Sequence, residues 1–309
     1  MPRPYAAVIG GINLDICGRS NEKLIPEDSN PGVVTMSPGG VGRNIAHNLR
    51  LLSVETVFLT ALGGDSWSRQ AELDCKALGM NLDYAVHVPD GTISIYLFLT
   101  EPDGNMALAL SDTEIAKAIT PAVLEARMDM LCAADAVVLD TNLEEDALQY
   151  VANHCTAPLF ADPVSVHKAD KLLPVLGKLH TLKPNLIEAA HLAGMEIRDR
   201  ESLYAVADRL LSTGLRRVVI SLGSHGALLA EGQKRVLLPC YPTKLVNVTG
   251  GGDAMMAALV YSHLHGKTLE ESGAYALAAG SMAVRCSVTN NPALFVSALE
   301  KLVKGEILL

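Results

Sequence analysis

The sequence predicts an α/β fold with a mostly parallel central sheet. Short runs rich in β-branched residues alternate with amphipathic segments of helical period, which is the pattern of βαβ units. Such alternation covers a parallel sheet with helices and gathers ligands at the carboxyl ends of its strands. We expect strands at Tyr5–Gly10, Val57–Leu62, Ala136–Asp140, Pro158–Asp162, His180–Lys183 and Val218–Leu222, the last five each preceding an amphipathic segment.

The size of the chain is compatible with a single large domain. Its 309 residues could form two average domains, but large α/β folds reach this length around one continuous sheet. Apolar residues make up 49% of the chain and charged residues 19%, which supports a sizeable core and argues against disorder. We therefore predict one domain over residues 1–309.

Two stretches, residues 16–36 and 87–112, interrupt the alternation of strands and helices. In the second, Ser94–Leu99 and Met106–Leu110 flank a turn at Pro102–Gly104, which predicts a β-hairpin. Because neither stretch is followed by its own helix, we expect the two to combine into a small β-sheet lid over the active site. An edge extension of the main sheet is the alternative.

The charge balance limits the class of ligand. The chain has 34 acidic and 25 basic residues, a formal net charge of −9, and no run rich in lysine and arginine. Nucleic-acid polymers are therefore excluded as expected partners. An anionic substrate such as ATP must be held by local backbone donors, a metal or a few placed cations.

The cysteines and the N-terminus suggest a reducing compartment. Six cysteines lie far apart, without the paired spacing of a zinc or redox site, so we expect reduced thiols. The chain enters a strand-like run at Tyr5 without the features of a signal peptide, and no apolar run approaches the length of a membrane span. We expect a cytoplasmic protein with no membrane partner.

A glycine loop near the C-terminal end is the strongest candidate for chemistry. Thr249 and the three glycines Gly250, Gly251 and Gly252 lead to Asp253 and then to an apolar run, Ala254–Leu264, that predicts a buried helix. Glycines cost backbone entropy but let N–H groups crowd against a phosphoryl group, and a carboxylate at the same turn can orient an attacking hydroxyl. The loop alone fits an N-capping aspartate equally well.

Polar groups near the N-terminus could bind sugar hydroxyls. Asn13 and Asp15 belong to the segment that is expected to close the first strand, and they share a side by period-two alternation. The cluster Gly39–Asn44 leads into a helix predicted at Ile45–Leu52, so that its backbone and the Asn44 amide can face the same cleft. Taken alone, each motif could equally be a turn or a helix cap.

Two further motifs could serve a nucleotide. Asn185 and Glu188 stand one helical turn apart after a strand, a spacing at which oxygen ligands can hold hydrated magnesium. The alternative is a capping arrangement in which Glu188 reaches back to Asn185. Ser221, Gly223 and Gly226 end another strand with small residues on which a nucleotide could lie, although a plain hairpin turn would have the same sequence.

In this order the motifs resemble the ribokinase or PfkB family of sugar and nucleoside kinases over essentially the whole chain. Gly39–Asn44 matches the first family signature, Asn185–Glu188 the magnesium-associated motif and Asn247–Asp253 the second signature. The resemblance implies a three-layer αβα sandwich with a β lid, ATP and Mg²⁺ as cofactors, and Asp253 as the catalytic base. It also implies an anion hole at Gly250, Gly251 and Gly252.

The resemblance implies further site residues. Ribose is expected to contact Asn13, Asp15, Gly40, Gly42 and Asn44, with Asn142 in the same cleft. ATP is expected near Asn185, Ser221, Gly223 and Gly226, and Mg²⁺ near Glu188 and Asn185 through water. Ser29, Asn30 and Lys168 are the candidates for contact with the base. Family members often dimerise through their lids, so a homodimer is expected.

Within the family the chain is most similar to the pseudouridine-kinase branch. The similar segments are Asp28–Gly32, Ser37–Asn44, Asp162–Ser165 and Thr289–Pro292. This resemblance implies transfer of the ATP γ-phosphate to the 5′-hydroxyl of pseudouridine. The alternatives are a kinase for ribose, fructose, adenosine, inosine or guanosine, and a non-catalytic nucleoside or nucleotide sensor.

The second signature departs from the family pattern at two positions. Gly251 replaces the usual alanine, which is expected to loosen the loop without removing a donor. Asn247 stands where many relatives carry a carboxylate beside a potassium ion. Asn247 and Thr249 are therefore candidates for a monovalent-cation site, but a neutral amide oxygen binds cations less strongly than a carboxylate.

Overall fold

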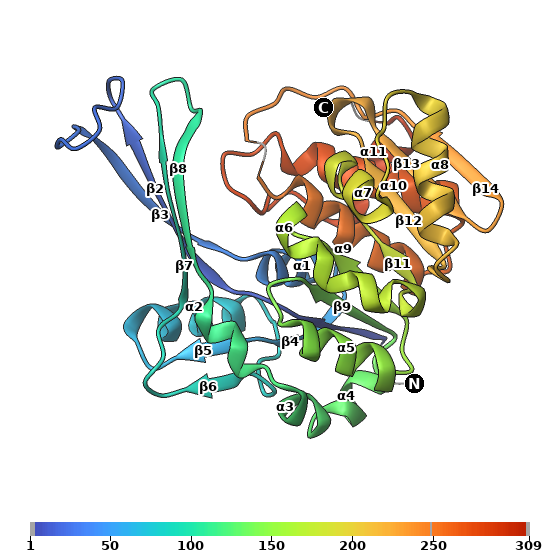
Figure 1. Ribbon diagram of the computed structural model, residues 1–309, viewed down its shortest axis with the longest axis horizontal. Helices are drawn as coiled ribbons and strands as arrows, with labels where there is room; N and C mark the ends of the chain where they lie inside the picture. The colour runs from blue at the N-terminus through green and yellow to red at the C-terminus, as the bar shows by residue number, and fades with distance from the viewer. Residues whose placement is uncertain (1–3, 248, 307–309) are drawn as a thin grey trace.

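An eight-stranded sheet lies at the centre of the computed structural model, which describes residues 4–247 and 249–306 (Figure 1). Its order is β14-β13-β12-β11-β10-β9-β1-β4, parallel from β4 to β12 and antiparallel between β12, β13 and β14. The mostly parallel α/β fold is confirmed. The strands are β1 Tyr5–Ile9, β4 Glu55–Leu59, β9 Ala136–Asp140, β10 Leu159–Asp162, β11 Thr181–Leu182, β12 Arg217–Ser221, β13 Ala227–Glu231 and β14 Lys234–Leu238.

Each face of this sheet is covered by helices, so its strands are apolar on both sides. In β1, Ala6 and Val8 enter one core cluster, whereas Ala7 and Ile9 enter the other. This gives the predicted three-layer sandwich. Helices that contribute to the first cluster are α1 Val41–Leu51, α2 Ser66–Ala77, α9 Gly251–Leu264, α10 Leu269–Ala283 and α11 Val296–Val303; the second includes α3 Pro121–Glu125, α4 Met128–Cys132, α5 Glu145–His154, α6 Val166–Ala169, α7 Leu186–Ala193 and α8 Arg200–Leu211.

A second sheet stands out from the body like an arm (Figure 1). Its order is β3-β2-β7-β8, and its strands are β2 Asn13–Ser20, β3 Gly32–Gly39, β7 Ser94–Thr100 and β8 Met106–Asp112. It is a separate sheet rather than an extension of the main one, and we call it the lid. Two short strands, β5 Ala61–Gly63 and β6 Val86–Val88, form a third, two-stranded sheet.

Several predicted element boundaries were wrong. The strand expected at Val57–Leu62 is divided into β4 and β5 at Thr60. The segment after β12 is not an amphipathic α-helix: a short 3-10 helix, Gly223–His225, leads into the antiparallel strand β13. Asn13 and Asp15 do not close the first strand; they open β2 of the lid.

Two helices begin earlier than predicted. The helix expected at Ile45–Leu52 begins at Val41, and the one expected at Ala254 begins at Gly251. Glycine is a poor helix former, so the sequence pattern places both starts too late. In the structure the first-turn N–H groups need no intrahelical acceptor, and glycine there brings those donors close to a ligand. Val248, within the second signature, lies outside the described residues.

Over residues 4–247 and 249–306, no helix has both the length and the apolar character needed to cross a membrane.

Burial of the central strands predicts the stability of single variants. Leu139 in β9 is fully buried, whereas Leu73 on α2 is largely exposed. Leu139→Ala is expected to lower the free energy of unfolding by about 3 kcal/mol, because it removes apolar contacts and leaves a cavity. Leu73→Ala should change it by less than about 1 kcal/mol. Urea unfolding followed by circular dichroism measures both, and equal losses would contradict the assigned core.

Candidate active site

Asp253 lies where the helices α1 and α9 meet. It is the third residue of α9, after the N-cap Gly250, and its Oδ2 accepts a hydrogen bond from Asn44 Nδ2 at 2.9 Å. The N-terminus of α9 has no side-chain cap, so the N-cap explanation for Asp253 is not what the structure shows. The carboxylate instead faces the neighbouring helix in a site that is almost closed to solvent.

Gly250 and Gly252 explain why glycine is needed in this loop. Gly250 has a φ of 83°, a conformation that side chains disfavour, and a Cβ there would meet Thr289 O at 2.4 Å. A Cβ on Gly252 would lie 3.2 Å from Lys183 Nζ. The free first-turn N–H groups of α9 and a lysine therefore converge on the same small space, which suits an anion.

A Cβ at Gly251 would lie 3.0 Å from Val284 Cγ1. The alanine usual in the family would thus need Val284 to shift.

Buried charges surround Asp253 at the carboxyl ends of the central strands. Lys183 Nζ pairs with Asp162 at 2.9 Å, and both side chains are buried. Burial raises the pKa of Asp253 to about 7, with Asp162 adding to the rise while Asn44 and Lys183 oppose it. Burial alone would lower the pKa of Lys183, but its ion pair with Asp162 outweighs this and raises it. The lysine is therefore charged, and Asp253 is a carboxyl group that can exchange a proton near neutral pH.

Asp140 joins three segments of the chain through its two carboxylate oxygens. Its Oδ2 accepts the backbone N–H groups of Gly11 at 2.9 Å and Gly42 at 2.7 Å, and its Oδ1 accepts that of Asn142 at 2.8 Å. These bonds tie the end of β1, the first turn of α1 and the loop after β9 to one buried carboxylate. They fix the backbone of Gly42 beside Asn44 and bring Asn142 to the same cleft. Gly40 is the N-cap of α1 in this arrangement.

Asn13 and Asp15 present unpaired oxygen atoms to the interior of the molecule. Oδ1 of each is buried and has no hydrogen-bond partner among residues 4–247 and 249–306. Burial raises the pKa of Asp15 to about 6, and Arg43 partly opposes this. Buried oxygen atoms are normally hydrogen-bonded, so these two can accept hydrogen bonds from polar ligand atoms such as sugar hydroxyls.

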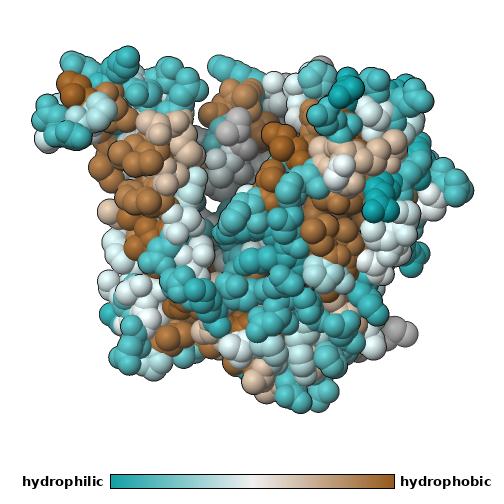
Figure 2. Space-filling model, in the orientation of Figure 1, coloured by the Kyte–Doolittle hydropathy of each residue, from teal (hydrophilic) through white to brown (hydrophobic). Residues whose placement is uncertain are grey.

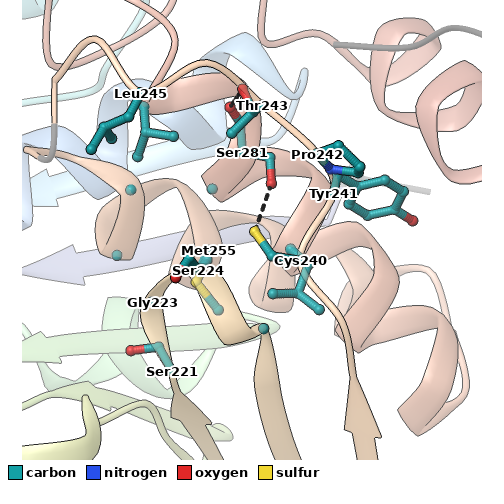
Figure 3. A pocket seen from close by; sticks show the side chains of 16 residues that line it. Ser221, Gly223, Ser224, Cys240, Tyr241, Pro242, Thr243, Leu245, Met255 and Ser281 are labelled. Atoms are coloured by element: carbon teal, nitrogen blue, oxygen red, sulfur yellow. Dashed lines mark hydrogen bonds between the residues drawn. The ribbon is translucent and has the colours of Figure 1, made fainter.

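A cavity of about 610 Å³ lies on the other side of the α9 N-terminus (Figure 3). Ser221, Gly223 and Gly226 line it from the β12–β13 hairpin, and Gly251 and Gly252 line it from α9. The β12–β13 hairpin, which was the alternative to a nucleotide-binding loop, is present, and it also forms one wall of the cavity. The remaining wall is largely apolar, which suits the flat face of a base; it includes Pro242, Leu245, Met255, Leu277 and Val284.

Asn185 and Glu188 form the capping box that was the alternative to a metal site. Glu188 N donates to Asn185 Oδ1 at 2.9 Å, and Asn185 N donates to Glu188 Oε2 at 2.8 Å. Asn185 is not among the residues that line the cavity. Glu188 is buried, and burial together with Asp162 raises its pKa. Within the described ranges, no group of three or more His, Cys, Asp or Glu side chains has the arrangement of a metal site.

The remaining predicted residues lie in three places. Asn247 Oδ1 accepts the Thr249 N–H at 3.0 Å, so the oxygen expected to bind a monovalent cation already has one partner, and that site stays a prediction. Lys168 Nζ donates to Asn142 Oδ1 at 2.6 Å, which places it at the sugar cleft.

Ser29 and Asn30 belong to the β2–β3 loop at the outer end of the lid (Figure 1). Asn30 uses its amide to close that loop on Ile25 and Asp28. The structure does not bring this pair to Asp253.

Similarity to known proteins identifies the family of this chain. The model of the pfkB family of carbohydrate kinases matches residues 3–294. The chain belongs to the pfkB family.

Two relatives of this pfkB-family chain are named as kinases of nucleosides. It is 38% identical to the pseudouridine kinase of Escherichia coli (strain K12) over 98% of the chain and 97% of that protein. It is 27% identical to the guanosine-inosine kinase of Exiguobacterium acetylicum over 86% of the chain and 89% of that protein. The ribokinase of Arabidopsis thaliana, solved with ribose and ATP, has the same fold, with a TM-score of 0.86, 23% identity and coverage of 98% and 99%.

Sequence reasoning did not assign roles to several residues of this pfkB-family site. Asp140 and Asp162 end strands, and Lys183 directly follows one. A charged residue at the end of an otherwise apolar strand is a signal that could have identified all three, because such strand ends meet at one edge of a parallel sheet. Arg43 and Asn290 carried no such signal.

The raised pKa of Asp253 predicts a pH-dependent effect on stability. Between the unfolded pKa near 4 and the folded value of about 7, the folded state binds more protons, so the ionised carboxylate destabilises it increasingly as pH rises. Asp253→Asn is expected to raise the melting temperature at pH 8, with a gain of roughly 1–4 kcal/mol that shrinks towards pH 4.5. Thermal unfolding of both proteins across this range tests it, and a pH-independent difference would contradict it.

Proposed function

We propose that this protein transfers the γ-phosphate of ATP to the 5′-hydroxyl of pseudouridine. The observation that carries the proposal is the position of Asp253, between a cleft with unpaired polar side chains and a cavity suited to a nucleotide. The 38% identical relative is a pseudouridine kinase, which favours this acceptor over other members of the family.

The sugar would bind between the lid and α1. Asn13 and Asp15 offer unpaired oxygens to two ribose hydroxyls, and Asn44 lies beside Asp253 at the point where the 5′-hydroxyl must be oriented. The backbone of Gly40 and Gly42 completes this wall. Lys168, which donates a hydrogen bond to Asn142, is the remaining candidate for contact with the base.

The nucleotide would bind in the cavity beside α9. Its adenine fits the apolar wall, and its phosphates would extend towards the N–H groups of Gly250, Gly251 and Gly252. Lys183, charged and 3.2 Å from the position of a Cβ on Gly252, adds a cation at this point. Glu188, of which only Oε2 is used in the capping box, would hold Mg²⁺ through water, and this ion would neutralise phosphate charge.

The transfer itself needs little from the protein beyond positioning. The 5′-oxygen forms a bond to the γ-phosphorus as the bond from that phosphorus to the β–γ bridging oxygen breaks, and ADP leaves. The hydroxyl proton passes to Asp253, whose pKa of about 7 allows it to accept a proton late in the reaction. The N–H groups at the start of α9 stabilise the negative charge on the transferring group.

A panel of acceptors with ATP tests the proposed substrate. Pseudouridine should give the highest kcat/KM among pseudouridine, uridine, ribose, fructose, adenosine, inosine and guanosine, measured as ADP release. Asp253→Asn is expected to lower kcat by about 10²–10⁴-fold while calorimetry still detects pseudouridine binding. Higher efficiency with another acceptor would reassign the substrate, and binding without ADP release would indicate a sensor.

We also propose that two copies pair through the lids. Strand register places Val34 and Met36 of β3 on one face with Leu108 and Leu110 of β8, and Met106 continues that row. Each of these side chains is more than half exposed, and brown patches mark the lid in Figure 2. Asp15 lies on the opposite face. A contiguous apolar face of this kind indicates an interface, and a second lid has the matching shape and chemistry.

A charged residue in this face should prevent pairing. Leu108→Asp is expected to convert a dimer into a monomer in sedimentation equilibrium, because an unpaired carboxylate would be buried in the apolar interface. Leu73→Asp, at an equally exposed position on α2, is the matched control and should remain dimeric. A monomeric wild-type protein, or a dimeric Leu108→Asp, would contradict lid pairing.

A further inference from the structure

Asn290 is a buried amide far from the signatures of the site in sequence, yet it contacts α1. It lies in the segment after α10. Its Nδ2 donates to Asn44 O at 3.0 Å and to Asn48 Oδ1 at 3.1 Å, and its Oδ1 accepts from Arg43 Nη1 at 2.7 Å. One side chain thus connects to three residues of the first two turns of α1.

Arg43 links this amide to Asn44. The guanidinium is buried, and its Nη1 donates both to Asn290 Oδ1 and, at 3.1 Å, to Asn44 Oδ1. Arginine has only donors, so both amide oxygens must face it. A buried charge is costly, and these two amide oxygens stabilise it together with Cys75 and the nearby carboxylates of Asp74 and Asp15.

The direction of the Asn44 amide follows from these contacts. With Oδ1 facing Arg43, Nδ2 faces Asp253 Oδ2 at 2.9 Å. A flipped amide would set an NH₂ group against the guanidinium and an oxygen against the carboxylate, and both pairs would repel. The chain of bonds from Asn290 through Arg43 and Asn44 to Asp253 is therefore consistent in only one orientation.

We propose that Asn290 and Arg43 are positioning residues that fix the Asn44 amide, and that this amide occupies Asp253 Oδ2 so that Oδ1 is presented to the substrate hydroxyl. Neither residue needs to touch the substrate. This inference rests on the proposed role of Asp253 as the base. It assigns a function to Arg43 and to the segment around Asn290, neither of which is used in the proposed binding of sugar and nucleotide.

A purely structural role is the competing explanation, because Asn290 also ties its segment to α1 through Asn48. The two explanations differ in their effect on Asp253. Its pKa reflects burial, Asp162 and Asp140, which raise it, and Asn44 and Lys183, which lower it. Disturbing the Asn44 amide should raise this pKa further, whereas loosening a surface segment should not.

The test compares Asn290→Ala with Asn291→Ala. Asn291 is adjacent and its side chain is also hydrogen-bonded, donating to Met282 O of α10 at 2.7 Å and accepting from Ala293 N at 2.9 Å, but neither bond leads to Asn44. The pKa of Asp253 is measured by ¹³C NMR of protein labelled at aspartate Cγ, with Asp253→Asn to assign the signal. Asn290→Ala keeps every charge near Asp253, so a shift in pKa reports the hydrogen-bond network.

We expect Asn290→Ala to raise the pKa of Asp253 above that of the wild type and to lower kcat/KM by roughly tenfold to a hundredfold, since small misplacements of catalytic groups have effects of this size. Asn291→Ala should leave the pKa unchanged. Arg43→Lys retains the buried charge but replaces the planar guanidinium with a single ammonium group. It should shift the pKa of Asp253 in the same direction. This variant is the one to measure if Asn290→Ala does not fold.

Two results would overturn the proposal: an unchanged pKa of Asp253 in folded Asn290→Ala or Arg43→Lys, or an equal shift in Asn291→Ala. The NMR measurement needs no acceptor, so a substrate other than pseudouridine would not affect it. If Asp253→Asn retained full turnover, the role of Asp253 as base would fail, and the NMR shift would still report separately on the amide network.

Discussion

The hydrogen bond between Asn44 and Asp253 connects the two halves of this molecule. Asn44 belongs to the first turn of α1, which follows the lid strand β3, and Asp253 belongs to the first turn of α9, which borders the large cavity. Both helix starts are glycine-rich, so their backbones come close to ligands and to each other. The site depends on this meeting of two helix N-termini above the carboxyl edge of a parallel sheet.

Around this bond the protein concentrates charge that a stable core would avoid. Asp140, Asp162 and Lys183 are buried at strand ends, and Asp253 is buried in the first turn of α9. Asp140 is satisfied by backbone N–H groups and Asp162 by Lys183, whereas Asp253 accepts a hydrogen bond from the uncharged amide of Asn44. Burial of this carboxylate raises its pKa to about 7. A pKa near neutrality is also what a late proton acceptor requires. Stability is reduced at the point where reactivity is needed.

The two faces of the lid differ in chemistry. Alternation along β2 places Asp15 on one face and Ile16 on the other, where the apolar rows of β3 and β8 lie. In the proposed function, the first face contacts the sugar and the second contacts another subunit. Pairing of lids would place the β2–β3 loops, with Ser29 and Asn30, near the partner rather than near Asp253 of their own chain.

The sequence by itself predicted the alternation of strands and helices along the chain, the buried helix after the glycine loop and Asp253 as a candidate base, because periodicity and glycine clusters are local properties of the chain. Local pattern misplaced the starts of α1 and α9 and could not choose between a cap and a phosphate site at Asp253, nor exclude the capping box at Asn185 and Glu188. Only the tertiary structure brought Asn290 to Arg43, residues 247 positions apart in the chain. Such contacts depend on how separate helices pack, and a hydrogen bond between distant amides leaves no periodic trace in the sequence.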